Sequence, residues 1–181
     1  MSFTISLIPL EAEHHAAALQ EVYRNVPAYW EMYNLIAPPA DQAVRDMAAA
    51  AETPGRVMIG VVKPVERGTA AAGAEMIGLV DFRLGWPGEN MAYIGMIMVA
   101  EPLQRQGIGT KAWLTLRPWL AAQPGITMAR LGVEQFNHTA LQFFTHLGFQ
   151  LTGESNRLRV GDKLVRLLYM ESEITQRKTE E

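Results

Sequence analysis

The sequence predicts an α/β fold in which a mixed, mostly antiparallel central sheet is flanked by helices. Strand and helix patterns follow one another along the 181 residues in the order β-α-α-β-β-β-α-β-α-β-β. One strand pattern, MAYIGMIMVA at 91–100, is apolar almost throughout, which is typical of a strand buried on both faces. The chain shows no repeat and no domain boundary, so we expect one domain over 1–174 and a charged tail over 175–181.

The first part of the chain is expected to hold one strand and two helices. FTISLIPL at 3–10 alternates apolar and polar side chains, which is strand periodicity. EAEHHAAALQEVYRNV favours a helix that ends before Pro27, and a second helix over 40–52 has Asp41 as its expected N-cap. The aromatic, proline-punctuated stretch 27–40 is expected to be a short helix or a lid-like loop.

Two further strands are expected before the apolar one. RVMIGVVKP at 56–64 is rich in β-branched residues, and MIGLVDFRL at 76–84 follows it. The small residues of 65–75 predict a loop between them, and GWPGEN at 85–90 predicts a turn.

The second half alternates helix and strand. We expect a helix over 110–123, kinked or divided by Pro118, because proline lacks the amide donor. A strand over 127–135 precedes a short helix capped by Asn137 and stopped by Gly148. A final strand pair is expected at 149–160 and 163–174, joined by the turn 161–162.

Composition excludes several classes of function. The net charge is −3 without a block of Lys and Arg, so no nucleic-acid or membrane partner is expected. The absence of cysteine excludes disulfides and thiolate metal sites. No third ligand accompanies His138 and His146, so no metal site is expected. The N-terminus lacks a signal-peptide pattern, and no apolar run approaches the roughly 20 residues of a membrane span, which favours the cytoplasm.

The stretch QRQGIG at 104–109 predicts an anion site. It stands between the apolar strand and a helix, whose first amides lack internal partners and carry the positive end of the helix dipole. Glycines let a phosphate approach the backbone closely, and Arg105 and Lys111 add positive charge.

Two phosphate-binding patterns compete for these glycines. A Walker-type loop fails because Gln104 stands where its first glycine is needed. The dinucleotide fingerprint G-x-G-x-x-A fits Gly107, Gly109 and Ala112, but the strand ends too far ahead and too few residues follow for a doubly wound domain.

A third pattern uses more of the chain. V-x-x-x-x-Q-x-x-G-x-G runs from Val99 to Gly109, and NHTALQFFTHLGF follows about 30 residues later. Both segments resemble motifs of the GCN5-related N-acetyltransferase (GNAT) superfamily, the second through Asn137, Ala140, Phe143, Gly148 and Phe149. The resemblance covers most of the chain and implies the GNAT-like acyl-CoA N-acyltransferase fold, with acetyl-CoA as co-substrate.

The resemblance also implies roles for individual residues. The loop amides would cradle the CoA pyrophosphate, and the strand ending at Val99 would splay from MARLGV and bond the pantetheine arm. The Val99 amide would polarise the thioester carbonyl. The expected cofactor-binding residues are Ile97, Met98, Val99, Gln104, Arg105, Gln106, Gly107, Ile108, Gly109, Thr110, Asn137 and Phe144.

The usual acid and base of that family are missing here. The slot of the family's tyrosine holds Phe144, and the slot of its glutamate holds Gly132. Glu134, on the same face as Gly132 if the strand is regular, is the nearest replacement for the base, with a solvated carboxylate as the alternative. Tyr93 is a candidate facing the cleft, with core packing as the alternative, and Tyr169 is a weaker candidate acid.

The acceptor side is predicted less sharply. Tyr29, Trp30 and Tyr33 fall where the family places a wall of the acceptor cleft, although a helix packed on the core explains them equally. Asp81 is a further candidate for the acceptor, with an ion pair as its alternative.

The expected function is transfer of an acetyl group from acetyl-CoA to a primary amine, by direct attack in a ternary complex. The amine belongs to a small molecule or a peptide, and a homodimer is possible. The alternatives are a non-catalytic module of the same fold that binds acyl-CoA, and a dinucleotide-binding protein.

Overall fold

The computed structural model describes residues 4–65, 73–160 and 163–174. The strands are β1 (Ser6–Pro9), β2 (Arg56–Pro64), β3 (Ala74–Leu84), β4 (Met91–Val99), β5 (Met128–Glu134), β6 (Gln150–Val160) and β7 (Lys163–Glu173). The helices are α1 (Ala12–Arg24), α2 (Pro27–Met32), α3 (Gln42–Glu52), α4 (Ile108–Ala121) and α5 (His138–His146), with a 3-10 turn, η1, at Glu101–Leu103. None of the described helices has the length and apolar character needed to cross a membrane.

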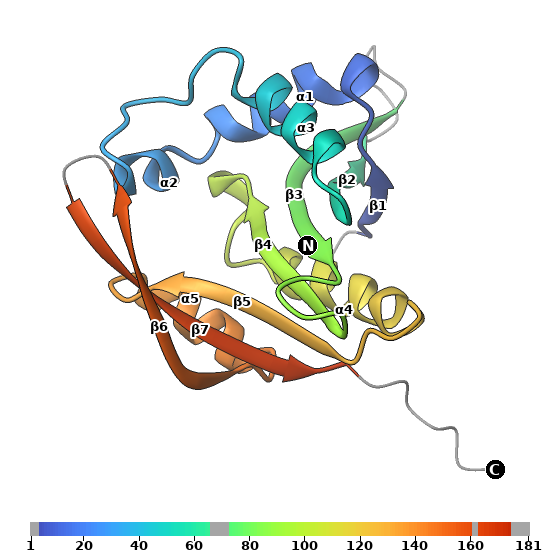
Figure 1. Cartoon of the computed structure of the whole chain (residues 1–181). Helices are drawn as coiled ribbons and strands as arrows, with labels where there is room; N and C mark the ends of the chain where they lie inside the picture. The colour runs from blue at the N-terminus through green and yellow to red at the C-terminus, as the bar shows by residue number, and fades with distance from the viewer. Residues whose placement is uncertain (1–3, 66–72, 161–162, 175–181) are drawn as a thin grey trace. The chain divides into compact units, whose positions relative to one another are not determined.

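The strands confirm the predicted fold class. Within the described residues, their hydrogen-bonded order is β1-β2-β3-β4-β5-β7-β6 in a seven-stranded sheet (Figure 1). β1 pairs antiparallel with β2, β7 pairs antiparallel with β5 and β6, and β4 runs parallel to β5. The sheet is therefore mixed and mostly antiparallel, as expected.

The chain forms two compact units that alternate along the sequence. Unit 1 comprises 1–82 and 96–116, and unit 2 comprises 83–95 and 117–181. The strands β3 and β4 and the helix α4 each contribute residues to both units. The single domain expected over 1–174 stays a prediction, and the tail lies outside the described residues.

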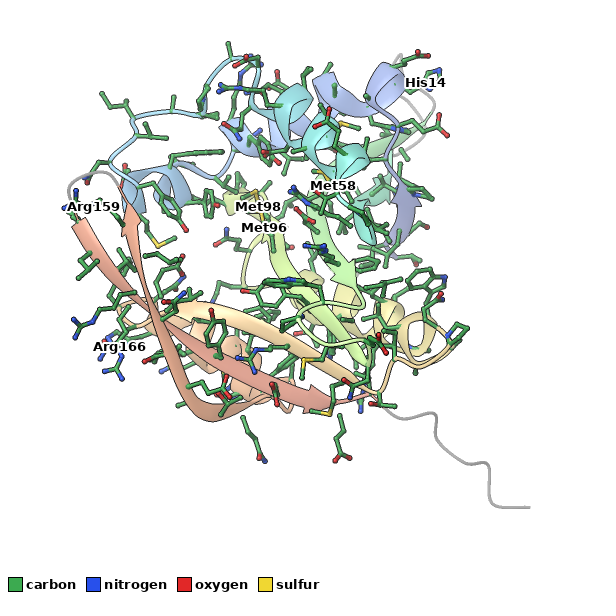
Figure 2. All side chains as sticks on the ribbon, in the orientation of Figure 1. His14, Met58, Met96, Met98, Arg159 and Arg166 are labelled. Carbon is green, nitrogen blue, oxygen red and sulfur yellow. The ribbon has the colours of Figure 1, made fainter. Side chains whose placement is uncertain are left out.

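Unit 1 is built on an apolar core between helices and strands. Helices α1 and α3 lie side by side (Figure 1). Their buried side chains repeat at helical spacing, which is why both segments form amphipathic helices. Figure 2 shows Met58 of β2 with Met96 and Met98 of β4, which pack in this core. The buried members are Leu19, Val22, Tyr23, Val26, Trp30, Ala43, Met47, Ala50, Met58, Leu79 and Met98.

The start of α3 corrects a predicted cap. Asp41 stands at the N-cap position, but its side chain makes no capping hydrogen bond and instead pairs with Arg45. Gln20 of α1 replaces it, because the Gln20 Oε1 accepts from the Ala43 amide at 3.0 Å. Its Nε2 also donates to the Pro39 carbonyl at 2.9 Å. A buried side chain from another helix therefore satisfies the amide that a local cap would have taken.

Unit 2 is dominated by the long antiparallel pairing of β7 with β5 and with β6. The β5–β7 ladder runs from Met128↔Glu173 to Glu134↔Leu167 without interruption. The β6–β7 ladder shifts register between Leu151 and Ser155, where Gly153 has a φ of +84°. Glycine adopts this backbone conformation without the strain that a Cβ would bring.

Several predicted boundaries need correction. The ladder assigns the first strand to Ser6–Pro9 rather than 3–10, and the start of that range lies outside the described residues. The helix α4 begins two residues earlier than expected, and Pro118 does not divide it. Proline removes a single hydrogen bond here, and Leu114, four residues earlier, is largely exposed, so water can bind its freed carbonyl.

Other expectations are confirmed or lie outside the description. The stretch 27–40 contains the short helix α2, and Asn137 caps α5 as predicted. Gly148, with a φ of +93°, follows the end of α5. Most of the predicted loop 65–75 and the turn 161–162 lie outside the described residues.

Candidate functional site

The glycine loop of unit 1 presents exposed backbone at the start of α4. Residues 104–107 are exposed, whereas Ile108, the first residue of α4, is buried. Arg105 and Gly107 both have left-handed backbone, with φ of +62° and +76°. A Cβ built on Gly107 would meet no atom within 4 Å.

The amides of this loop are available to a ligand. The Lys111 amide donates to the Gly107 carbonyl, but among the described residues no acceptor is found for the amides of 105–110. Consecutive amides in a left-handed turn, followed by a helix start, form a concave anion site. This geometry fits the pyrophosphate of CoA.

Two side chains hold the loop in place. Gln104 is not merely solvated, as its exposure alone would suggest, because its Nε2 donates to the Val99 carbonyl at 2.8 Å. Glu101 of η1 accepts from the Ala28 amide at 2.8 Å and donates its own amide to the Asn25 carbonyl at 2.8 Å. The loop is therefore tied both to the end of β4 and to the α1–α2 connection.

The parallel ladder between β4 and β5 is short. It runs from Met91↔Met128 to Ile94↔Leu131, although β4 continues to Val99 and β5 to Glu134. The β4 residues after Ile94 therefore lie outside this ladder. The splay of the two strands beyond this ladder stays a prediction.

In unit 2, one face of the sheet gathers polar side chains. Tyr93 of β4 pairs with Arg130 of β5 in the parallel ladder. Gly132 lies opposite Tyr169 of β7. Directly opposed residues and residues two apart along a strand share a face, so these four residues lie on one side.

Glu134 shares that face, as predicted from a regular strand. It lies two residues beyond Gly132 and opposite Leu167. After burial and Tyr169, the Glu134 carboxylate also contributes to raising the pKa of Tyr93. Its role as a base stays a prediction.

The missing side chain at Gly132 has a steric cause. A Cβ built there would lie 2.5 Å from Cδ2 and 2.8 Å from Cγ of Leu167, and 3.0 Å from the Tyr93 hydroxyl oxygen. The Tyr93 hydroxyl and Leu167 thus occupy the space that a glutamate side chain would enter. The Tyr93 hydroxyl is the polar group nearest to the position that a Cβ at residue 132 would occupy.

The Tyr93 hydroxyl is neutral at ordinary pH. Burial raises its pKa, and Tyr169 and Glu134 raise it further, while Arg130 lowers it. A neutral phenol donates a hydrogen bond or a proton but does not act as a base. The ring packs edge-on against Trp86, with centroids 4.8 Å apart.

Arg130 is a further polar residue of this face, which the sequence did not single out. Its guanidinium pairs with Glu154 and Glu171 and lies 4.3 Å from the centre of the Tyr169 ring. Those pairs neutralise its charge and fix it beside the tyrosine. The alternation of Arg130, Gly132 and Glu134 along one strand was the available signal.

Two residues of the second motif have partners within α5 and its flanks. The Asn137 Oδ1 accepts from the Ala140 amide at 3.1 Å, while the described residues offer no partner to its Nδ2. Asn137 can therefore cap the helix and still donate to a ligand. Phe144 lies between Phe143 and Phe149, with ring centroids 5.0 and 5.5 Å away.

The predicted acceptor residues divide into core and surface. Trp30 is buried and its Nε1 donates to the Tyr23 carbonyl at 2.7 Å, which supports the packing alternative for this residue. Tyr29 and Tyr33 are partly exposed; the Tyr29 ring packs edge-on against Trp30, and the Tyr33 ring packs against Tyr29. The Asp81 carboxylate accepts three hydrogen bonds from Arg56, so its ion-pair alternative is realised. Contact of any of these residues with an acceptor stays a prediction.

No group of three or more potential metal-binding side chains occurs within residues 4–65, 73–160 and 163–174.

The expected site residues are divided between the two compact units. Unit 1 holds the glycine loop, the end of β4 and the aromatic residues of α2. Unit 2 holds Tyr93, Glu134, Asn137 and Phe144.

Comparison with known proteins adds independent information. A sequence profile described as the acetyltransferase (GNAT) family matches residues 22–149, which include the glycine loop and α5. A search of curated proteins found no matching sequence.

Solved structures share the fold at low sequence identity. An acetyltransferase from Thermus thermophilus is 23% identical, with a TM-score of 0.71 and 94% of this chain and 97% of that chain covered. The ribosomal-protein-S18-alanine N-acetyltransferase of Escherichia coli is 16% identical, with a TM-score of 0.66 and coverage of 98% and 99%. Arabidopsis thaliana NAA60 in complex with acetyl-CoA is 15% identical, with a TM-score of 0.70 and coverage of 94% and 99%.

Proposed function

Because the chain belongs to the acetyltransferase (GNAT) family, we propose that it moves the acetyl group of acetyl-CoA to a primary amine by direct attack in a ternary complex. Membership of this family makes the protein an N-acetyltransferase with acetyl-CoA as co-substrate. The observation that supports the proposed binding mode is the run of loop amides at 105–110, for which the described residues offer no acceptor. The acceptor we propose is a small-molecule or peptide amine.

Backbone amides and the Asn137 side chain are proposed to bind acetyl-CoA. The loop amides hold the pyrophosphate, and the Asn137 Nδ2 donates to the CoA arm. The Val99 amide binds the carbonyl oxygen as negative charge develops on it. Acetyl-CoA supplies the acetyl group as a thioester, whose C–S bond breaks as the C–N bond forms.

Two protons must move during the reaction. A protonated amine, with a reference pKa of about 10.4 for lysine, loses a proton before it attacks, and the leaving thiolate gains one. Glu134 is the proposed acceptor of the first proton, and the Tyr93 hydroxyl is the proposed donor of the second. The face shared by Tyr93 and Glu134 supports this pairing.

The first experiment is a thermal melt of the protein with acetyl-CoA, CoA, NADH or no ligand. Acetyl-CoA at 100 times its Kd should add about 2.7 kcal/mol, a rise in Tm of about 5–10 °C. Gly107→Val should weaken acetyl-CoA binding at least about tenfold, because its side chain blocks phosphate approach and disfavours the positive φ. The matched control is Gly125→Val, at a φ of +78° in unit 2 with nothing within 4 Å of its Cβ.

Different outcomes separate the alternatives. Equal loss of acetyl-CoA stabilisation in both variants would disprove the loop assignment. Stabilisation by NADH would favour the dinucleotide-binding alternative. Binding of acetyl-CoA without turnover of any amine would favour the non-catalytic module. Phe144 and Gly132 support that alternative, because they replace the tyrosine and the glutamate that the family usually carries.

The pH dependence tests the two proton carriers. Tyr93→Phe should lower kcat about 100-fold with unchanged acetyl-CoA affinity, because the ring packing survives and the donor is lost. Wild-type kcat/KM should rise with pH to a plateau if Glu134 is the base, and Glu134→Gln should abolish that plateau. The check is a full pH profile of kcat/KM for wild type, Tyr93→Phe, Tyr169→Phe and Glu134→Gln. A larger loss in Tyr169→Phe than in Tyr93→Phe would contradict the assignment of the acid.

A further inference from the structure

The distal part of the β6–β7 hairpin carries three arginines on one face. Arg157 of β6 lies directly opposite Arg166 of β7, and Arg159 lies opposite Leu164. Opposed residues share a face, as do residues two apart on one strand, so the three arginines project to the same side. Figure 2 labels Arg159 and Arg166 on the two strands of this hairpin. We call these three residues the arginine face.

The charge of the arginine face is not neutralised within the described chain. All three side chains are exposed, and none forms an ion pair with a described residue. The Arg166 Nε donates to the Ser155 Oγ at 3.1 Å, a neutral partner that positions the guanidinium. Two carboxylates of the described part of the hairpin, Glu154 and Glu171, bind Arg130 instead.

This arrangement works against the stability of the hairpin. Like charges directly opposite each other on paired strands repel. Protection of an exposed sheet edge explains charges on β6, the outer strand of the order, but not Arg166 on β7, which lies between β5 and β6. Neither the stability of the fold nor protection of the sheet edge therefore explains the arginine face.

We propose that the arginine face binds an acidic segment of a partner protein. Guanidinium groups hold carboxylates through paired hydrogen bonds, and three of them on neighbouring positions suit two or three acidic residues in an extended segment. Leu164, which is 64% exposed and opposite Arg159, adds an apolar contact of the kind found in protein interfaces. Residues 155–160 and 163–168 contain no aromatic side chain for base stacking, which favours a polypeptide over a nucleic acid.

The test measures binding of defined peptides by fluorescence anisotropy. The probe is a fluorescein-labelled peptide of alternating glutamate and leucine, compared with the same peptide carrying glutamine for glutamate and with a single-stranded oligothymidine of equal charge. The double variant Arg157→Gln/Arg159→Gln should bind the acidic peptide at least about tenfold more weakly than wild type, with a smaller salt dependence. The matched control, Arg24→Gln/Arg45→Gln, removes the same charge from the exposed faces of α1 and α3 and should stay near wild type.

Charge reversal adds a test that does not rely on a loss of peptide binding alone. Arg157→Glu/Arg159→Glu should reject the glutamate peptide and bind a matched lysine peptide. The proposal is overturned if wild type does not bind the acidic peptide, if the control variant loses as much affinity, or if the oligothymidine binds more tightly. It is also overturned if sedimentation shows wild-type dimers that the double variant abolishes, since a second copy would then be the occupant. None of these readouts depends on acetyl transfer.

Discussion

Replacing Gly78 by alanine should destabilise the protein by about 3 kcal/mol, at the upper end of the usual cost of overpacking. A Cβ at this position would lie 2.4 Å from the carbonyl oxygen of Met98 and 3.4 Å from the Cβ of Val61. The obstacle is backbone of β4, so no side-chain rotation can relieve the contact. At about 2–4 °C for each kcal/mol, Tm should fall by about 6–12 °C, and Gly78→Val should prevent folding.

The matched control lies just before the same strand. Gly73 has nothing within 4 Å of a built Cβ, and its φ is not in the left-handed region. Gly73→Ala should therefore leave Tm unchanged or raise it slightly, because alanine reduces the entropy of the unfolded chain. Thermal or urea unfolding of both variants decides the matter, and an equal loss in both would show that the close approach of β4 is not what Gly78 provides.

Gly78 also connects packing with the site. The close approach that it permits fixes the backbone of Met98, one residue before the Val99 amide proposed to bind the thioester carbonyl. The loop that follows is fixed by Gln104 through the Val99 carbonyl. A small strand shift at Gly78→Ala should therefore reduce acetyl-CoA affinity as well as stability.

Features set by local sequence were predicted well. The glycine loop follows from Gly107 and the helix start, and the structure gives that glycine the left-handed backbone that its residue type suits. The cap at Asn137 also follows from its residue type and position, and its side chain accepts from the expected turn of α5. In each case neighbours in sequence supply both partners of the interaction.

Features that depend on residues far apart in the sequence were missed, because neighbours in sequence do not supply both partners of the interaction. Asp41 looks like a cap, yet Gln20, more than twenty positions earlier, takes the amide of Ala43. Trp30 is an aromatic residue in an aromatic segment, and no local pattern separates its buried ring from the partly exposed Tyr29 and Tyr33. Only the packing of α1, α2 and α3 in unit 1 distinguishes these roles.

Gly132 is the case in which sequence comparison alone misleads most. The family resemblance shows a missing carboxylate and invites its restoration. We expect Gly132→Glu instead to destabilise the protein by about 3 kcal/mol or more, since its Cβ would approach Leu167 to 2.5 Å and the Tyr93 hydroxyl to 3.0 Å. Activity should fall with the folded fraction rather than rise, as urea unfolding and kcat measured on the same samples would show.

The companion substitution Leu167→Ala removes the two carbon atoms that obstruct the position. Alone it should cost about 2 kcal/mol, at the low end for leucine truncation, because Leu167 lies at the border of the core and is 9% exposed. Combined with Gly132→Glu it should cost less than the sum of the two, by about 1–3 kcal/mol, because the new side chain then has room beside the Tyr93 hydroxyl. Additive losses would mean that Leu167 is not the obstacle. A recovered fold with a kcat/KM plateau that survives Glu134→Gln would show that a carboxylate at position 132 can take over the base, and that packing by Leu167 and Tyr93 explains why this chain carries glycine there.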